Sequence, residues 1–519
     1  MLPGKIATLL VISAILSVIG ALLVAWRYRV AMQALMTAPL AAPSTGQAAP
    51  SRPLPCTADA PARPVSLADN RRAERQLIVA FLGITLVMSL ARTLLMQVLA
   101  NGPITIITVS TLCAAYAWPV VPVVAIIRRW SRRRFATSLL LWFVAAVALL
   151  SWRTTEDVQF IQVLKWMSFD IGLPLVVVSA LCLGSATRAV APWLAPLFFL
   201  LAWASLTGID VLEALVGSNS PIAFWLASLF GAVTAIVLFA FAFVFIAWWP
   251  ARALGRWLGR AYAARQISEL FYLFSAVWVI ALTGPALGAI ASEGWRALLY
   301  FLPLICIPFG ARLMQATTGQ RQPGRPPTLL VLRVFQQDAN VQDLFNRVIE
   351  RWRLTGNTVL IAGTDLLTHT TDPDDIFTFL DGRLAERFIH SPADVPRRIA
   401  AFEWQPDVEG RYRVNECYCH DTTWQLALAE LLRVSDVVLM DLRNFIAANK
   451  GCLYELETLS SAPGLNRVVV LVNDRTELAA AQAATAKAPA SRFVWVPQQG
   501  DTPPATEQVL APLLGTPSN

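Results

Sequence analysis

Charged side chains are scarce in this sequence of 519 residues. Asp, Glu, Lys and Arg together make up 15% of it, whereas a soluble domain carries about 25%. Hydrophobic residues account for 56%. This balance excludes a disordered chain and an ordinary soluble enzyme, and it is typical of a polytopic membrane protein. Lysine is rarer still, with four among the 42 cationic residues, so arginine carries nearly all the positive charge.

Cysteine and histidine are too few and too scattered to indicate a disulfide framework or a metal site. The seven cysteines are odd in number and irregularly spaced, so we expect reduced thiols. Strand alternation over 411–419 places Cys417 and Cys419 on one face and His420 on the other, which is not zinc-ligand spacing. The phosphate-binding glycine motifs are also missing. We therefore expect no metal and no cofactor.

Apolar runs of about 20 residues, the length that crosses a bilayer, occur through the first 310 residues. We predict nine spans, at 6–26, 77–99, 104–127, 136–152, 171–183, 190–209, 221–249, 270–290 and 298–310. The basic loops between them predict a multi-pass inner-membrane protein with a cytoplasmic C-terminal part. The lipid bilayer is therefore its first expected partner.

Changes in composition divide the chain into six segments. We predict a first transmembrane helix at 1–36, a Pro/Ala-rich linker at 37–76, the further spans at 77–312, a second linker at 313–327, an α/β domain at 328–500 and a flexible tail at 501–519.

Charge divides the chain as well. Up to Arg325 there are 25 Lys and Arg against 10 Asp and Glu, and after it 17 against 24. The acidic C-terminal part argues against a nucleic-acid partner. Arg92 lies deep in the second span, where a charge marks either a substrate site or a structural pair. Because no acidic residue falls at that depth in the expected spans, we favour the structural role, and a transporter with a regulatory tail is the least favoured function.

From residue 328 onward, short apolar runs alternate with amphipathic stretches. The pattern predicts strands at 329–335, 358–362, 411–419, 436–442, 467–472 and 492–496, and helices at 341–353, 376–388, 424–434, 451–459 and 477–487. Such alternation indicates a doubly wound parallel sheet, which binds ligands beyond the carboxyl ends of its strands.

Two acidic residues are expected at that edge beside the helix that follows the strand ending at Asp441. Glu455 falls in the first turns of that helix, and Asp338 follows the first strand. A carboxylate there suits glycosidic chemistry, in which it stabilises or attacks a cationic sugar. The residues leave structural roles open: Glu455 as a favourable first-turn acid, Asp338 as a helix cap, Asp441 as a turn cap, and Arg443 as a surface residue rather than a phosphate ligand.

The segment Cys452-Leu453-Tyr454-Glu455-Leu456 resembles the C-x-x-E-L motif of TIR (Toll/interleukin-1 receptor) domains. Gly451, Glu455 and Leu456 are similar to the corresponding motif of nucleoside 2-deoxyribosyltransferase-like proteins. Gly451 stands where TIR domains have Trp, Asp441 stands where they have Ser, and an insertion at about 365–421 replaces a short loop. The resemblance implies a flavodoxin-like fold and places Glu455 where TIR enzymes keep the glutamate that cleaves the nicotinamide–ribose bond of NAD.

The resemblance implies that Asp338, Asp441, Arg443 and Cys452 line the ligand site around Glu455. It implies a membrane-tethered hydrolase of NAD or a related nucleotide in signalling or defence. The alternative is a non-enzymatic signalling module that binds a nucleotide or partner domains. In either case a second copy of the chain is a possible partner through the TIR-like or the membrane part.

Overall fold

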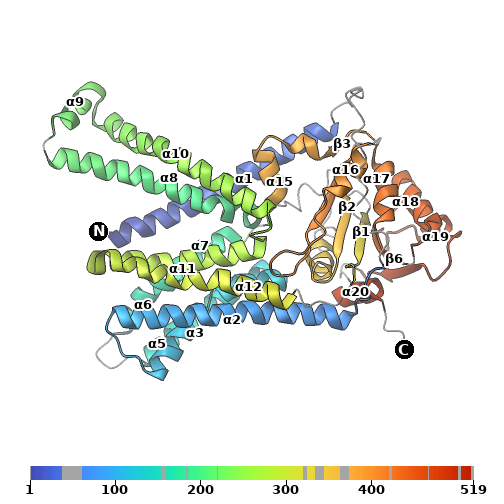
Figure 1. Ribbon diagram of the computed structural model, residues 1–519, viewed down its shortest axis with the longest axis horizontal. Coiled ribbons are helices and arrows are strands. Elements are labelled where there is room, and N and C mark those ends of the chain that lie inside the picture. Colours follow the sequence, from blue (N-terminus) through green and yellow to red (C-terminus); the bar gives the residue numbers. More distant parts are fainter. Residues whose placement is uncertain are drawn as a thin grey trace. The chain divides into compact units, whose positions relative to one another are not determined.

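The computed structural model describes residues 2–37, 61–153, 159–182, 185–218, 220–318, 324–333, 344–362, 373–391, 393–419, 423–465, 467–500 and 504–515. The chain forms two compact units (Figure 1). The helical unit comprises Met1–Arg27, Phe81–Gly310 and Thr371–Phe377, and the α/β unit comprises Tyr28–Ala80, Ala311–Thr370 and Thr378–Asn519. Each unit is thus assembled from separated stretches of the sequence.

Long apolar helices make up most of the first 318 residues. They are α1 (Leu2–Thr37), α2 (Leu67–Leu99), α3 (Ile106–Tyr116), α4 (Val120–Ile127), α5 (Arg132–Arg153), α6 (Phe160–Met167), η1 (Ser168–Gly172), α7 (Leu173–Cys182), α8 (Ser185–Gly217), α9 (Pro221–Phe230), α10 (Ala232–Ala263), α11 (Glu269–Glu293), η2 (Gly294–Ile305) and α12 (Cys306–Thr318).

Eight helices of the described segments are long and apolar enough to cross a membrane, and the bent pair α3 and α4 brings the number to nine if it counts as one span. Each of the nine expected spans overlaps one of them in order. The fifth is longer than expected, because Phe160–Cys182 is a continuous helical stretch interrupted only by the π-helical turn η1. The seventh is divided at Gly231, whose φ of 81° ends α9 before α10 begins.

The expected linker at 37–76 is wrong at its C-terminal end, because α2 begins at Leu67. Ser66 and Asp69 hydrogen-bond reciprocally at its start: the Ser66 amide donates to Asp69 Oδ2 at 3.0 Å, and the Asp69 amide donates to Ser66 Oγ at 3.2 Å. This is a capping box. The first turns of α2 are rich in charged residues and therefore carry no apolar signal.

The α/β unit contains a seven-stranded, fully parallel sheet with the strand order β3-β4-β2-β1-β5-β6-β7. The strands are β1 (Thr328–Arg333), β2 (Asn357–Ala362), β3 (Phe388–Ile389), β4 (Val414–Cys419), β5 (Val437–Asp441), β6 (Val468–Val472) and β7 (Phe493–Pro497). The parallel sheet with interspersed helices agrees with the expected fold class. Without β3 and β4, the order is 2-1-3-4-5, as in flavodoxin-like sheets. Both extra strands lie in the insertion at 365–421 and extend the sheet beyond β2.

The helices interspersed with the strands are η3 (Phe345–Ile349), α14 (Glu350–Trp352), α15 (Pro373–Leu380), η5 (Leu384–Arg387), α16 (Asp394–Ala400), α17 (Trp424–Arg433), α18 (Lys450–Ser461), α19 (Leu478–Ala484) and α20 (Thr506–Leu514). The expected helix at 376–388 is shorter than predicted: α15 ends at Leu380, and Gly382, with a φ of 73°, begins a turn that leads into η5.

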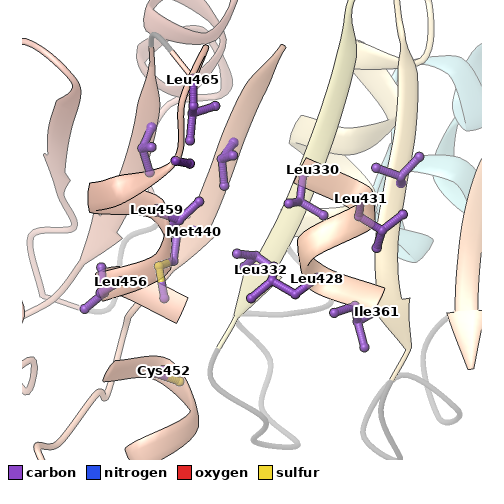
Figure 2. Close-up of a cluster of buried hydrophobic side chains, with 14 of the residues drawn as sticks. Leu330, Leu332, Ile361, Leu428, Leu431, Met440, Cys452, Leu456, Leu459 and Leu465 are labelled. Atoms are coloured by element: carbon purple, nitrogen blue, oxygen red, sulfur yellow. The ribbon is translucent and has the colours of Figure 1, made fainter. Parts of the chain in front are cut away.

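One face of the sheet is packed against α17 and α18 (Figure 2). Alternate residues of β1 and β5 point to this face, as the two-residue period of a strand requires. The residues in contact are fully buried and include Leu330, Leu332, Leu428, Leu431, Met440, Leu456 and Leu459. This core fixes α18 against the strands and so sets the position of Glu455.

The prediction of a flexible tail at 501–519 is wrong for Thr506–Leu514, because these residues form α20, a helix with a buried apolar face. Val509, Leu510 and Leu513 are at most 2% exposed. The helix contacts β5, β6 and β7, and Arg467 Nη1 donates to the Pro512 carbonyl at 2.7 Å. Its apolar residues recur at the three- and four-residue spacing of an amphipathic helix, but the helix is short and the surrounding prolines conceal the signal.

Candidate functional site at the carboxyl edge of the sheet

A tight turn connects β5 to α18 and determines where the first turns of the helix lie. Asn444 adopts a left-handed φ of 65°, which asparagine tolerates better than most residues. The Asn444 amide donates to Asn473 Oδ1 at 2.9 Å, and Thr476 Oγ1 donates to the Leu442 carbonyl at 2.9 Å. The segment after β6 therefore holds this turn in place, and α18 begins at Lys450.

Glu455 lies in the second turn of α18 and is buried, with 3% of the residue exposed. Its Oε2 atom has no hydrogen-bond partner among the described residues. Burial raises the pKa of this carboxyl to about 8, and the nearby positive charge of Arg333 opposes the rise. A carboxyl that is buried and incompletely hydrogen-bonded is expensive to retain for stability alone, and perturbed acids of this kind cluster at functional sites.

Arg333 was not singled out from the sequence, yet it is the charged residue that acts on Glu455. It ends β1, is 2% exposed, and its Cα is in register with that of Asp441 on β5. The strand order therefore places Arg333 and Asp441 at one edge of the sheet, and α18 adds Glu455 to it. The signal for this residue is that it is the only charged side chain in the apolar run 329–335. The apolar pattern predicts a buried strand there and assigns no role to the arginine.

Asp441 and Arg443 form a closed ion pair. Arg443 Nη2 donates to Asp441 Oδ2 at 2.5 Å and Arg443 Nε donates to Oδ1 at 2.8 Å. Arg443 Nη1 also donates to Gln498 Oε1 at 3.0 Å. The Arg443 amide donates to Asp441 Oδ1 at 3.2 Å, which is the turn-capping role left open from the sequence. The two charges neutralise each other, and a ligand role for either residue stays a prediction.

Cys452 lies one helical turn before Glu455, within the apolar core that Figure 2 displays. It is 5% exposed. Burial raises the pKa of its thiol to about 12, and the charge of Glu455 adds to the rise. The thiol is therefore protonated at neutral pH and unsuited to nucleophilic attack. Its side chain is part of the apolar core beneath the site.

Two predicted features lie outside the described residues. Asp338 is one of them, together with the chain that directly follows β1 and β2. His420 is the other. Within the described ranges, no group of three or more His, Cys, Asp or Glu side chains could hold a metal ion. Burial raises the pKa of the Cys417 thiol to about 12, as expected for a core residue.

No protein-family model matches the chain, and comparison with curated proteins and with solved structures gives no match. Function must therefore be inferred from the geometry of the site. That geometry is a buried, incompletely hydrogen-bonded carboxyl at the junction of β1 and β5. At this junction the chain order of the strands reverses direction, which is where doubly wound sheets bind ligands.

Proposed function

We propose that the α/β unit hydrolyses the N-glycosidic bond of NAD or a related nucleotide, and that Glu455 is the catalytic carboxyl. The observation that carries this proposal is Glu455 itself, which is 3% exposed and whose Oε2 atom has no hydrogen-bond partner in the described segments. Its place at the reversal point of the strand order and the C-x-x-E-L resemblance support the same role. In this proposal the domain has a flavodoxin-like, TIR-like fold.

The chemistry explains why a carboxyl with a raised pKa suits a cationic substrate. Cleavage of the bond between nicotinamide and ribose develops positive charge on the sugar, and a carboxylate beside the ring stabilises that charge. Nicotinamide leaves as a neutral base and needs no added proton. Water supplies a hydroxyl to the anomeric carbon and releases a proton. A cationic pyridinium ring bound beside Glu455 favours its ionised form, and so lowers its pKa toward neutrality when substrate is present.

The basic residues of the helical part support a placement in the inner membrane with the α/β unit in the cytoplasm. The strongest support is the cluster of arginines from Arg128 to Arg134, which begins after α4 and includes the first turn of α5. Basic loops of this length stay on the cytoplasmic side. The unit would then act on a cytoplasmic nucleotide while it is tethered to the bilayer, as a signalling or defence enzyme requires.

The test uses the full-length protein in lipid nanodiscs, incubated with NAD and with a panel of nucleosides, and chromatography follows the release of the free base. We expect the wild-type protein to release nicotinamide and Glu455→Gln to lose at least 100-fold in rate. Glu457→Gln is the matched control, because Glu457 lies on the exposed face of the same helix, and its rate should stay within twofold.

Three outcomes are informative. Equal rates for wild type and Glu455→Gln would remove Glu455 from the mechanism. Release of base from nucleosides but not from NAD would change the substrate and keep the carboxyl. Binding of NAD without turnover by the wild type would replace the enzyme with a non-enzymatic signalling module.

A further inference from the structure

The helical unit contains a buried ion pair that the proposed enzyme does not use. Arg92 of α2 is 1% exposed and Asp170 of η1 is 3% exposed. Arg92 Nη2 donates to both carboxylate oxygens of Asp170 at 2.9 Å, and the guanidinium carbon lies 3.7 Å from the ring centroid of Tyr116. Our expectation that Arg92 has no acidic partner at its depth is therefore wrong. The expected fifth span began one residue after Asp170.

This pair uses only one of the three guanidinium nitrogens. An arginine that pairs with a carboxylate usually presents two nitrogens to the two oxygens. Here Nη2 alone donates to the two oxygens of Asp170, and Arg92 Nε and Nη1 have no hydrogen-bond partner among the described residues. Three N–H groups of a buried cation are thus left without an acceptor in the described part of the chain.

Buried hydroxyl groups without a hydrogen-bond partner in the described chain also lie along α2. Thr85, Ser89 and Thr93 are at most 1% exposed, and within the described parts of the chain their hydroxyls have no partner. Ser89, Arg92 and Thr93 are neighbours on the helix surface, since they are three and four residues apart. Thr85 lies one turn further, so the four residues span about 12 Å of the helix. We call these four residues the donor face of α2.

Buried donors also occur on or beside helices that contact α2. The indole N–H groups of Trp118, between α3 and α4, and of Trp278 on α11 are also buried without an acceptor in the described chain. Helix α11 contacts both α4 and η1, the turn that contains Asp170. The π-helical form of that turn is itself unusual, and such turns occur frequently at functional sites.

The chemistry of the unpaired groups favours an anionic ligand. Each unpaired buried donor destabilises the folded state, so this set is unfavourable unless something accepts its hydrogen bonds. Arginine and indole nitrogens only donate, and hydroxyls can donate. A metal cation needs several oxygen ligands, but both oxygens of Asp170 already accept from Arg92. We propose that the donor face of α2 is a binding site for a small monovalent anion of the halide type, inside the membrane-spanning unit.

The test measures thermal unfolding of the full-length protein in detergent with sodium chloride or sodium bromide replacing sodium gluconate at constant ionic strength. An anion that binds only the folded state raises Tm with its concentration. We expect a saturable rise in Tm for the wild type. The double variant Ser89→Ala, Thr93→Val keeps the Arg92–Asp170 pair, removes two donors, and should weaken halide binding at least tenfold. Thr137→Val is the control, because the exposed Thr137 hydroxyl donates to its own helix.

Asp170→Asn separates an anion site from a purely structural pair. Without the carboxylate, the Arg92 charge has no counterion, so apparent halide affinity should rise at least tenfold although the protein without halide is less stable. Equal halide responses in the wild type and the double variant would place the anions at the surface and overturn the proposal. So would the absence of a saturable response in the wild type, which would leave water as the partner of these donors. Neither result depends on whether Glu455 is catalytic.

Discussion

Asn70 and Arg351 hydrogen-bond to each other in both directions across 281 residues of sequence. Arg351 donates to Asn70 Oδ1 from Nη2 at 2.9 Å and from Nε at 3.1 Å, and Asn70 Nδ2 donates to the Arg351 carbonyl at 2.7 Å. Arg351 also pairs with Glu74 one turn further along α2. The first turns of α2 are therefore an integral part of the α/β unit.

Removal of the Asn70 side chain should destabilise the α/β unit. Asn70 is fully buried, so Asn70→Ala leaves donors of Arg351 unsatisfied, and we expect a loss of about 1–3 kcal/mol. Thermal unfolding of the full-length protein and hydrogen exchange at residues 67–80 report the change. Arg75→Ala, on the exposed side of the same helix, is the control and should change stability by less than about 0.5 kcal/mol. Equal effects of the two variants would contradict the role of Asn70.

Glu455 should make the stability of the α/β unit fall as the pH rises. Its pKa is raised to about 8 in the folded protein, above the ordinary value near 4.5 that it has when unfolded. Between these values the folded state keeps a proton that the unfolded state releases. The contribution of Glu455 to stability is therefore largest below about pH 4.5, falls by up to about 1.4 kcal/mol per pH unit in between, and levels off above pH 8. Denaturant unfolding between pH 5 and 9 measures the slope.

Glu455→Gln is the test of this assignment, because glutamine does not titrate. We expect the variant to lose the Glu455 part of the slope and to be more stable than wild type at pH 9. Glu457→Gln should retain the wild-type slope. A variant profile parallel to that of the wild type would show that Glu455 is ionised in the folded protein throughout this range.

Either single substitution in the Asp441–Arg443 pair should be costly, because it leaves an uncompensated charge in the core. Their side chains are 5% and 2% exposed, and loss of one partner from such a pair costs about 3–5 kcal/mol. We expect Asp441→Asn and Arg443→Met each to destabilise strongly, and the double variant to cost less than the sum of the two, as measured by a double-mutant cycle.

The exposed pair of Glu430 and Arg433 on α17 provides the comparison for that cycle. Arg433 is 71% exposed, and surface pairs are worth about 0–1 kcal/mol. Additive effects at Asp441 and Arg443 would mean that the two side chains do not stabilise each other. A direct contact of either one with a ligand would then be the better explanation of its charge.

Local patterns predicted the elements well and long-range relations poorly. The long apolar helices were predicted because each contains a run of about 20 apolar residues, and the strands because buried parallel strands are continuous apolar runs. The order of those strands was not predictable from the pattern. The alternation predicted a strand at 411–419, which is β4, but it revealed neither β3 nor the position of both strands beyond β2.

The residues whose roles the sequence did not predict share one property. Each is a polar residue in a helix or strand that is predicted from its apolar residues. Asp170 was placed just outside a span, although η1 continues the helix through it. Arg333 lies in a run that was predicted as an apolar strand, so no role was assigned to it. The start of α2 was assigned to a linker because its charged residues gave no apolar signal. In each case the partner that explains the polar residue lies far away in the sequence.

The division of the α/β unit between two stretches of chain affects its biosynthesis. Residues 67–80 leave the ribosome before most of the membrane spans, whereas their partner Arg351 and every strand of the sheet follow the last span. The face of α2 around Asn70, which is buried in the folded protein, therefore stays exposed until more than 250 further residues have been synthesised. The α/β unit can therefore be completed only after the whole helical unit has been synthesised.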